Sequence, residues 1–183
     1  QRFVVGCYRR SPSRGLWIFD NGYDAKRNER YFVKKSGLKT NFPQKRDFYN
    51  NLTGYTKEIA STTGNPTITV DTTKGNLTKN SLKVYKPSSN TTYAYAIQRV
   101  TGLPTGTYTF SCYANTEGAT ISGGGIYVGY KVLDTNGNFI EQRKAEDKKS
   151  TDGWERMNIT FDVTSGETVW LLVGLEGGTY PAS

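Results

Sequence analysis

The chain has 183 residues, of which 35% are hydrophobic and 13% aromatic, with 20 glycines and 13 tyrosines. Its length suits one full β-sandwich with an additional element, whereas two complete sandwiches would need more residues. The aromatic content excludes a disordered chain, and two cysteines are too few for a disulfide scaffold. This turn-rich composition is typical of an all-β protein of the extracellular kind.

The formal charge of +8 is concentrated in the N-terminal part of the sequence. Residues 1–50 contain 12 Lys and Arg against 4 Asp and Glu, whereas residues 51–183 contain 12 of each kind. A basic segment can meet nucleic acid, an anionic cell-wall polymer or an acidic partner chain, or it can be a solvated surface. Because no helix-turn-helix, zinc-finger or RRM pattern accompanies it, nucleic acid is the weakest of these partners.

Residues 1–45 predict a small, basic, β-rich extension or the end of a preceding domain. Two short apolar runs, residues 3–5 and 16–19, have Pro and Gly between them, which predicts a hairpin. Residues 31–33 predict a third short strand. A piece of this size cannot form its own core, so we expect it to pack on the sandwich, a neighbouring domain or another subunit. With no signal region and no apolar run of membrane-spanning length, the sequence predicts a fragment of a longer chain and no membrane partner.

Residues 46–183 predict one antiparallel β-sandwich. Its first candidate strands are residues 57–60, 67–71, 82–85 and 93–100. Four later runs alternate between apolar and polar residues, as half-buried strands do: residues 106–114, 126–132, 157–163 and 169–175. Nothing between them has helical spacing long enough to cover their apolar faces, so a second sheet is the expected cover.

The apolar faces of these runs predict a common core. Its expected members, with Cys112 as a buried free thiol, are Tyr108, Phe110, Cys112, Ile159, Phe161, Val169, Leu171 and Val173.

Residues 134–138, Asp-Thr-Asn-Gly-Asn, predict a hairpin with a primed turn. The oxygen-rich tip of this hairpin could bind a structural calcium ion. Turn chemistry accounts for every residue of the tip, so we expect neither a metal ion nor another cofactor. Residues 141–152, of mixed charge, predict an edge strand or an exposed loop.

Three segments share strand order and turn positions with a known family. They are residues 81–84, the run from Gln98 to Ser111 with its Gly-Leu-Pro-Thr-Gly turn, and Gly153-Trp154 before an alternating strand. In these positions the sequence resembles the jelly-roll carbohydrate-binding modules of the family 4/9/22 type. Such modules are appended to extracellular glycanases, surface proteins of Gram-positive bacteria and phage tail proteins. The resemblance implies a jelly roll that binds a polysaccharide or cell-wall glycan, and that lacks its last strand because the sequence stops before it.

The sequence contains no histidine. That removes the commonest general base, the commonest zinc ligand and every triad built on His. Paired carboxylates remain as catalytic groups, but the acids after residue 50 lie mostly in turns or on polar strand faces, where a solvated charge is the ordinary state. We therefore expect a protein that is not an enzyme.

Once catalysis is set aside, ligand binding is the remaining class of function. Sugars bind to flat aromatic faces flanked by hydrogen-bonding groups. The aromatics on the strand faces opposite to the core residues are the strongest candidates, and ordinary cross-strand packing is the alternative for each of them. Two neighbouring polar residues could supply hydrogen bonds. The candidate ligand-binding residues are Trp170, Tyr113, Tyr127, Tyr95, Gln98 and Arg99.

Two functions fit these observations. The first is a non-catalytic carbohydrate-binding module that attaches a larger extracellular or virion protein to a glycan. The alternative is a structural or adhesion β-sandwich of a phage tail or bacterial surface assembly, in contact with neighbouring domains or other subunits. Both functions place the protein outside the cell, at a cell surface or on a virion. Exposed aromatics favour the first function, and aromatics covered by residues 1–50 or by a partner favour the second.

Overall fold

The computed structural model describes the backbone of residues 2–9 and, with side chains, residues 52, 54–76, 80–87, 92–118 and 124–176. Within these ranges no helix is long and apolar enough to cross a membrane. The candidate strands at residues 16–19 and 31–33 lie outside the described residues. The strands, in chain order, are β1 (Arg2–Arg9), β2 (Thr56–Ile59), β3 (Thr67–Asp71), β4 (Ser81–Tyr85), β5 (Ala94–Val100), β6 (Gly106–Asn115), β7 (Gly125–Leu133), β8 (Phe139–Lys144), β9 (Glu155–Val163) and β10 (Thr168–Glu176).

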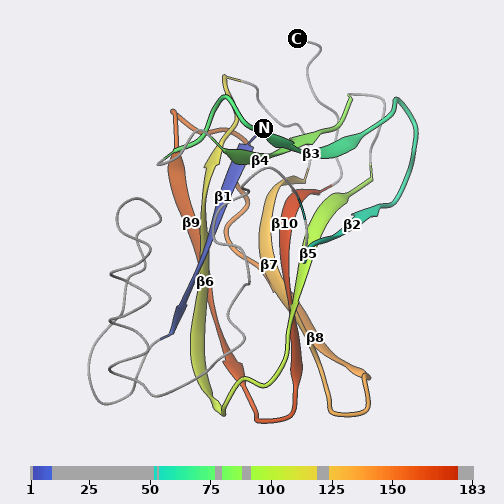
Figure 1. The fold of residues 1–183 in the computed structure, drawn as a ribbon, viewed down its shortest axis with the longest axis vertical. Helices are drawn as coiled ribbons and strands as arrows, with labels where there is room; N and C mark the ends of the chain where they lie inside the picture. Colours follow the sequence, from blue (N-terminus) through green and yellow to red (C-terminus); the bar gives the residue numbers. More distant parts are fainter. Residues whose placement is uncertain are drawn as a thin grey trace.

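The strands form two five-stranded antiparallel sheets that pack face to face (Figure 1). The first sheet has the order β3-β4-β1-β6-β9, and the second has the order β2-β5-β10-β7-β8. In Figure 1, β9, β6 and β1 lie side by side in one layer, and β7, β10 and β5 in the other. Most consecutive strands lie in different sheets, as in a jelly roll. The all-β sandwich predicted from the sequence is confirmed.

Strand β1 lies inside the first sheet, between β4 and β6. It pairs with β6 along its whole length, from Arg2 opposite Asn115 to Arg9 opposite Tyr108. Residues 2–9 are therefore part of the sandwich, although the sequence patterns assign them to the extension. Their partners are far away in the sequence, and no local pattern reports such pairing. The assignment of the other residues up to 45, and the expected lack of a last strand, stay predictions.

The core lies between the two sheets, where the predicted apolar faces meet. Phe110 is fully buried and Cys112 is buried without a disulfide bond, as predicted. Ile159 is partly buried and packs against the core. The ring of Tyr130 stacks on that of Phe161, with 4.5 Å between the centroids. All eight residues expected in the core belong to this cluster or pack against it, so the strand phases are confirmed.

The hairpin predicted at residues 134–138 is present between β7 and β8, but its turn is not primed. A primed turn needs a positive φ at its first central residue, whereas in this loop Gly137 alone has a positive φ, of 84°. The Gly137 N–H donates to the Asp134 carbonyl at 3.0 Å and closes an ordinary turn. The Asp134 carboxylate accepts hydrogen bonds from the backbone N–H groups of Asn136 and Asn138 and from the Asn138 side chain. These hydrogen bonds also hold the pKa of Asp134 below its usual value.

Candidate ligand-binding face

The outer faces of the two sheets differ in chemistry. On the first sheet, hydroxyl groups pair across the strands: Thr107 donates to Asp162 at 2.6 Å, and Thr109 and Thr160 share a hydrogen bond of 2.9 Å. This is the polar outer face that a sandwich ordinarily carries. The second sheet instead carries a second apolar cluster on its outer face, which we call the outer aromatic cluster: Tyr93, Tyr95, Ile97, Tyr127, Trp170 and Leu172.

The alternation of β5 creates one side of the outer aromatic cluster. Residues 93–99 read Tyr-Ala-Tyr-Ala-Ile-Gln-Arg, so the large residues leave the sheet on one side and the alanines on the other. Ala94 and Ala96 belong to the core, whereas Tyr95 and Ile97 belong to the outer cluster. The central strand β10 adds Trp170 and Leu172 between β5 and β7.

Three tyrosine rings lie in a row at one end of this face. The centroids of Tyr93 and Tyr95 are 4.6 Å apart with an interplanar angle of 10°. Tyr95 and Tyr127 are also 4.6 Å apart, tilted by 40°. Tyr95 and Tyr127 both lie opposite Gly174 in β10, which has no side chain to separate the rings. The three tyrosines therefore form a continuous aromatic surface across β5, β10 and β7.

The hydroxyl groups of Tyr93 and Tyr127 are hydrogen-bonded at the rim of the cluster. Tyr93 donates to the Glu58 carboxylate at 2.7 Å, and the Gln142 side-chain amide donates to the Tyr127 hydroxyl at 2.9 Å. The hydrogen bond to Glu58 raises the pKa of Tyr93, and burial raises the pKa of Tyr95 and Tyr127. All three phenols are therefore protonated at neutral pH.

Exposure divides the outer aromatic cluster into two parts. Tyr95 and Tyr127 are only 6% and 4% exposed, and Ile97 and Leu172 are also buried. Tyr93 and Trp170 are partly exposed. Tyr95 and Tyr127 thus act as a packed floor, and the rings that a ligand can reach are those of Tyr93 and Trp170.

Trp170 lies in a cross-strand row with two cations. It is paired with Arg99 of β5 on one side and with Lys131 of β7 on the other. The Arg99 Cζ and the Lys131 Nζ each lie 4.6 Å from the centre of the Trp170 ring. Contacts of this kind contribute about 0.5–1 kcal/mol each at exposed sites. The row therefore presents an indole and two positive charges together.

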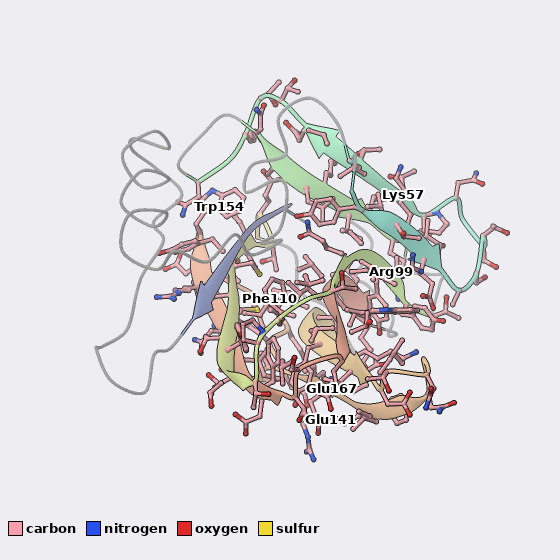
Figure 2. The ribbon with its side chains drawn as sticks, turned by 60° about the horizontal axis from the view of Figure 1, so that its bottom comes forward. Lys57, Arg99, Phe110, Glu141, Trp154 and Glu167 are labelled. Carbon is pink, nitrogen blue, oxygen red and sulfur yellow. The ribbon has the colours of Figure 1, made fainter. Side chains whose placement is uncertain are left out.

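The structure brings four of the six predicted site residues to this face: Trp170, Tyr127, Tyr95 and Arg99. Tyr113 lies on β6 of the first sheet, out of phase with Phe110 and Cys112, and so belongs to the opposite side of the sandwich. Gln98 belongs to the core face of β5, because it alternates with Arg99, and it is only 4% exposed. Arg99 of the second sheet and Phe110 of the first lie in different layers (Figure 2).

Sequence reasoning overlooked Tyr93 and Lys131. The Tyr-Ala-Tyr-Ala alternation could have identified Tyr93, because it places both tyrosines on one face. No local signal pairs Lys131 with Trp170, since their contact depends on the register between β7 and β10.

The buried side chain of Gln98 is expected to lower the stability of the core. Its Oε1 atom is buried and has no hydrogen-bond partner among the described residues. We expect Gln98→Met to raise the free energy of unfolding by about 1 kcal/mol, because a buried acceptor without a partner costs about 1–3 kcal/mol and Met fills a similar volume. Urea denaturation measures the change. Gln142→Met on exposed β8 is the control and should bring no gain, and a loss of stability in Gln98→Met would show that the amide is satisfied.

The described residues contain no group of three or more His, Cys, Asp or Glu side chains that could hold a metal ion.

No protein-family model and no curated protein sequence matches this chain. Among solved structures, the enzymatically active domain of tailspike protein 4 from bacteriophage CBA120 aligns with a TM-score of 0.47 and 14% identity, over 72% of this chain and 19% of that chain. A family 35 carbohydrate-binding module from Clostridium thermocellum aligns with a TM-score of 0.31 and 17% identity, over 69% of this chain and 82% of the module. A family 35 module from Cellvibrio japonicus Abf62 has a TM-score of 0.32 and 13% identity, over 70% and 97%. At these TM-scores and sequence identities, the structural similarities give no information about the ligand. The ligand is therefore inferred from the residues of this chain.

Proposed function

We propose that this β-sandwich is a non-catalytic carbohydrate-binding module that recognises a glycan with the outer face of its second sheet. The outer aromatic cluster is the observation that supports this proposal. A sandwich needs one apolar face per sheet, and the second sheet has two. Aromatic rings beside hydrogen-bonding groups suit pyranose rings, whose C–H faces are apolar and whose hydroxyls need directional partners.

The partly exposed rings and the charged residues at the rim make different kinds of contact with the glycan. Trp170 and Tyr93 provide the apolar contact, and Arg99, Lys131 and Glu58 provide the hydrogen bonds. Tyr95 and Tyr127 hold the surface rigid, so little conformational entropy is lost on binding. Tyr113 is left out of this site because it lies on the other sheet. In this proposal the module attaches a larger extracellular or virion protein to its glycan.

Trp170→Ala tests the proposed function. We expect it to weaken glycan binding about thirtyfold or more, because a central aromatic commonly contributes 2 kcal/mol or more to binding. The free energy of unfolding should fall by only about 1 kcal/mol, since the ring is partly exposed and lies outside the core. A glycan array followed by isothermal titration calorimetry gives the affinity, and thermal unfolding gives the stability.

Tyr113→Ala is the matched control, because it removes an aromatic from the outer face of the other sheet and should leave glycan affinity unchanged. If the unmodified chain binds no glycan and Trp170→Ala dissociates an assembly instead, the protein is a structural or adhesion module, and the carbohydrate proposal is wrong.

A further inference from the structure

The charges on the outer face of the second sheet are unevenly distributed. At the tyrosine end, Lys144 forms ion pairs with both Glu176 and Asp147. Glu58 accepts the hydrogen bond from Tyr93. The positive charge at this end is therefore matched by carboxylates.

The Trp170 end is different. Arg99 and Lys131 both contact the indole ring, and among the described residues neither has a carboxylate within ion-pair distance. The cation-π contacts orient the two side chains but leave their charges uncompensated. An arginine and a lysine held in this way form a preorganised anion site.

The carboxylates of the same face are too far along the strands to neutralise this pair. Glu58 is paired with Tyr95, four residues from Arg99 on β5, which is about 13 Å of strand. Glu176 is six residues from Trp170 on β10, or about 20 Å. Both separations exceed the Debye length of about 8 Å at physiological salt.

The carboxylates at the nearby turn and edge strand have other partners. Glu167 accepts a hydrogen bond from the Thr164 N–H at 2.7 Å. Glu141 accepts a hydrogen bond from Tyr130 and forms an ion pair with Arg143. The Trp170 row thus keeps two positive charges that a ligand can meet.

We infer that the glycan is acidic, and that uronate carboxylates of the polysaccharide bind the Arg99 guanidinium and the Lys131 ammonium, which come from the strands on either side of Trp170. This inference rests on the proposed function and adds the class of sugar. A neutral pyranose can pack against the exposed part of the indole but gains no ion pair there, whereas a uronate polymer also meets the two cations where they lie. The guanidinium also matches a carboxylate with two parallel hydrogen bonds.

The test compares uronate polymers with their carboxyl-reduced forms, which keep the sugar rings and lose the charge. Polygalacturonate, alginate and hyaluronan serve as probes for the full chain. We expect at least one of them to bind, with affinity at least about tenfold higher than its reduced form and falling with ionic strength. Arg99→Gln and Lys131→Gln should each weaken this binding several-fold without lowering the melting temperature.

Lys57→Gln is the matched control, because Lys57 is an exposed lysine of the same sheet that pairs with Ala96, a residue of the core face (Figure 2). It should leave the affinity unchanged. An equal loss in Lys57→Gln, or equal binding of polyglutamate, would show attraction by net charge and overturn the inference. Binding to neutral glycans but to no uronate polymer would overturn the acidic-sugar inference and leave the proposed function intact. Binding to no glycan at all would end both.

Discussion

Phe110→Ala is expected to destabilise the sandwich by about 3–5 kcal/mol, the usual cost of emptying a buried phenylalanine site. Phe110 is 0% exposed and lies in the middle of β6, between β1 on one side and β9 on the other. It belongs to a core cluster with residues from both sheets, so the cavity cannot close without moving strand backbones. Because a domain of this size has about 5–15 kcal/mol of stability in total, the variant should unfold at a much lower urea concentration.

Phe139→Ala provides the matched control for this loss. It removes the same atoms from a residue that is 61% exposed on the edge strand β8. We expect its free energy of unfolding to change by about 0.5 kcal/mol or less. A cost below 1 kcal/mol for Phe110→Ala, or equal costs for the two variants, would contradict the burial of this face of β6.

The alternation along each strand was enough to predict which side chains meet in the core. Phe110 and Val173 face inwards, and Trp170 and Tyr127 face outwards, because successive residues of a strand point to opposite sides. By the same rule Gln98 and Arg99, which are adjacent in β5, cannot both lie on one face of the sheet. Gln98 could therefore have been assigned to the core from its spacing to Ala96 and Val100.

The neighbour relations of the strands could not be predicted in this way. Alternation gives Tyr113 and Trp170 the same outward phase, yet β6 and β10 belong to different sheets. The row of Arg99, Trp170 and Lys131 exists because β5, β10 and β7 are adjacent in one particular register. Register is set by the whole packed sheet, so the site emerges from long-range pairing rather than from any segment.

The floor of the candidate site depends on a close approach between β10 and β5 at Gly174. A methyl group on Gly174 would overlap the Ala94 carbonyl group and lie 2.9 Å from the Tyr95 Cα. These are backbone atoms, so the strands would have to separate. Tyr95 is the middle ring of the tyrosine row, so the displacement would reach the aromatic surface directly.

We expect Gly174→Ala to lower the free energy of unfolding by about 3 kcal/mol, at the upper end of the usual cost of overpacking, because backbone rather than flexible side chains must move. Any glycan affinity should fall with the stability, even at temperatures where the variant stays folded.

Gly106→Ala in β6 is the control, since the added carbon would meet the Tyr108 ring at an ordinary distance of 3.8 Å. Alanine otherwise suits a strand better than glycine, so this control should be neutral or gain up to about 1 kcal/mol. Urea denaturation of both variants measures the difference in stability. If Gly174→Ala were as stable as Gly106→Ala, β5 and β10 would not be as close as the register requires. The tyrosine floor would then not depend on their contact.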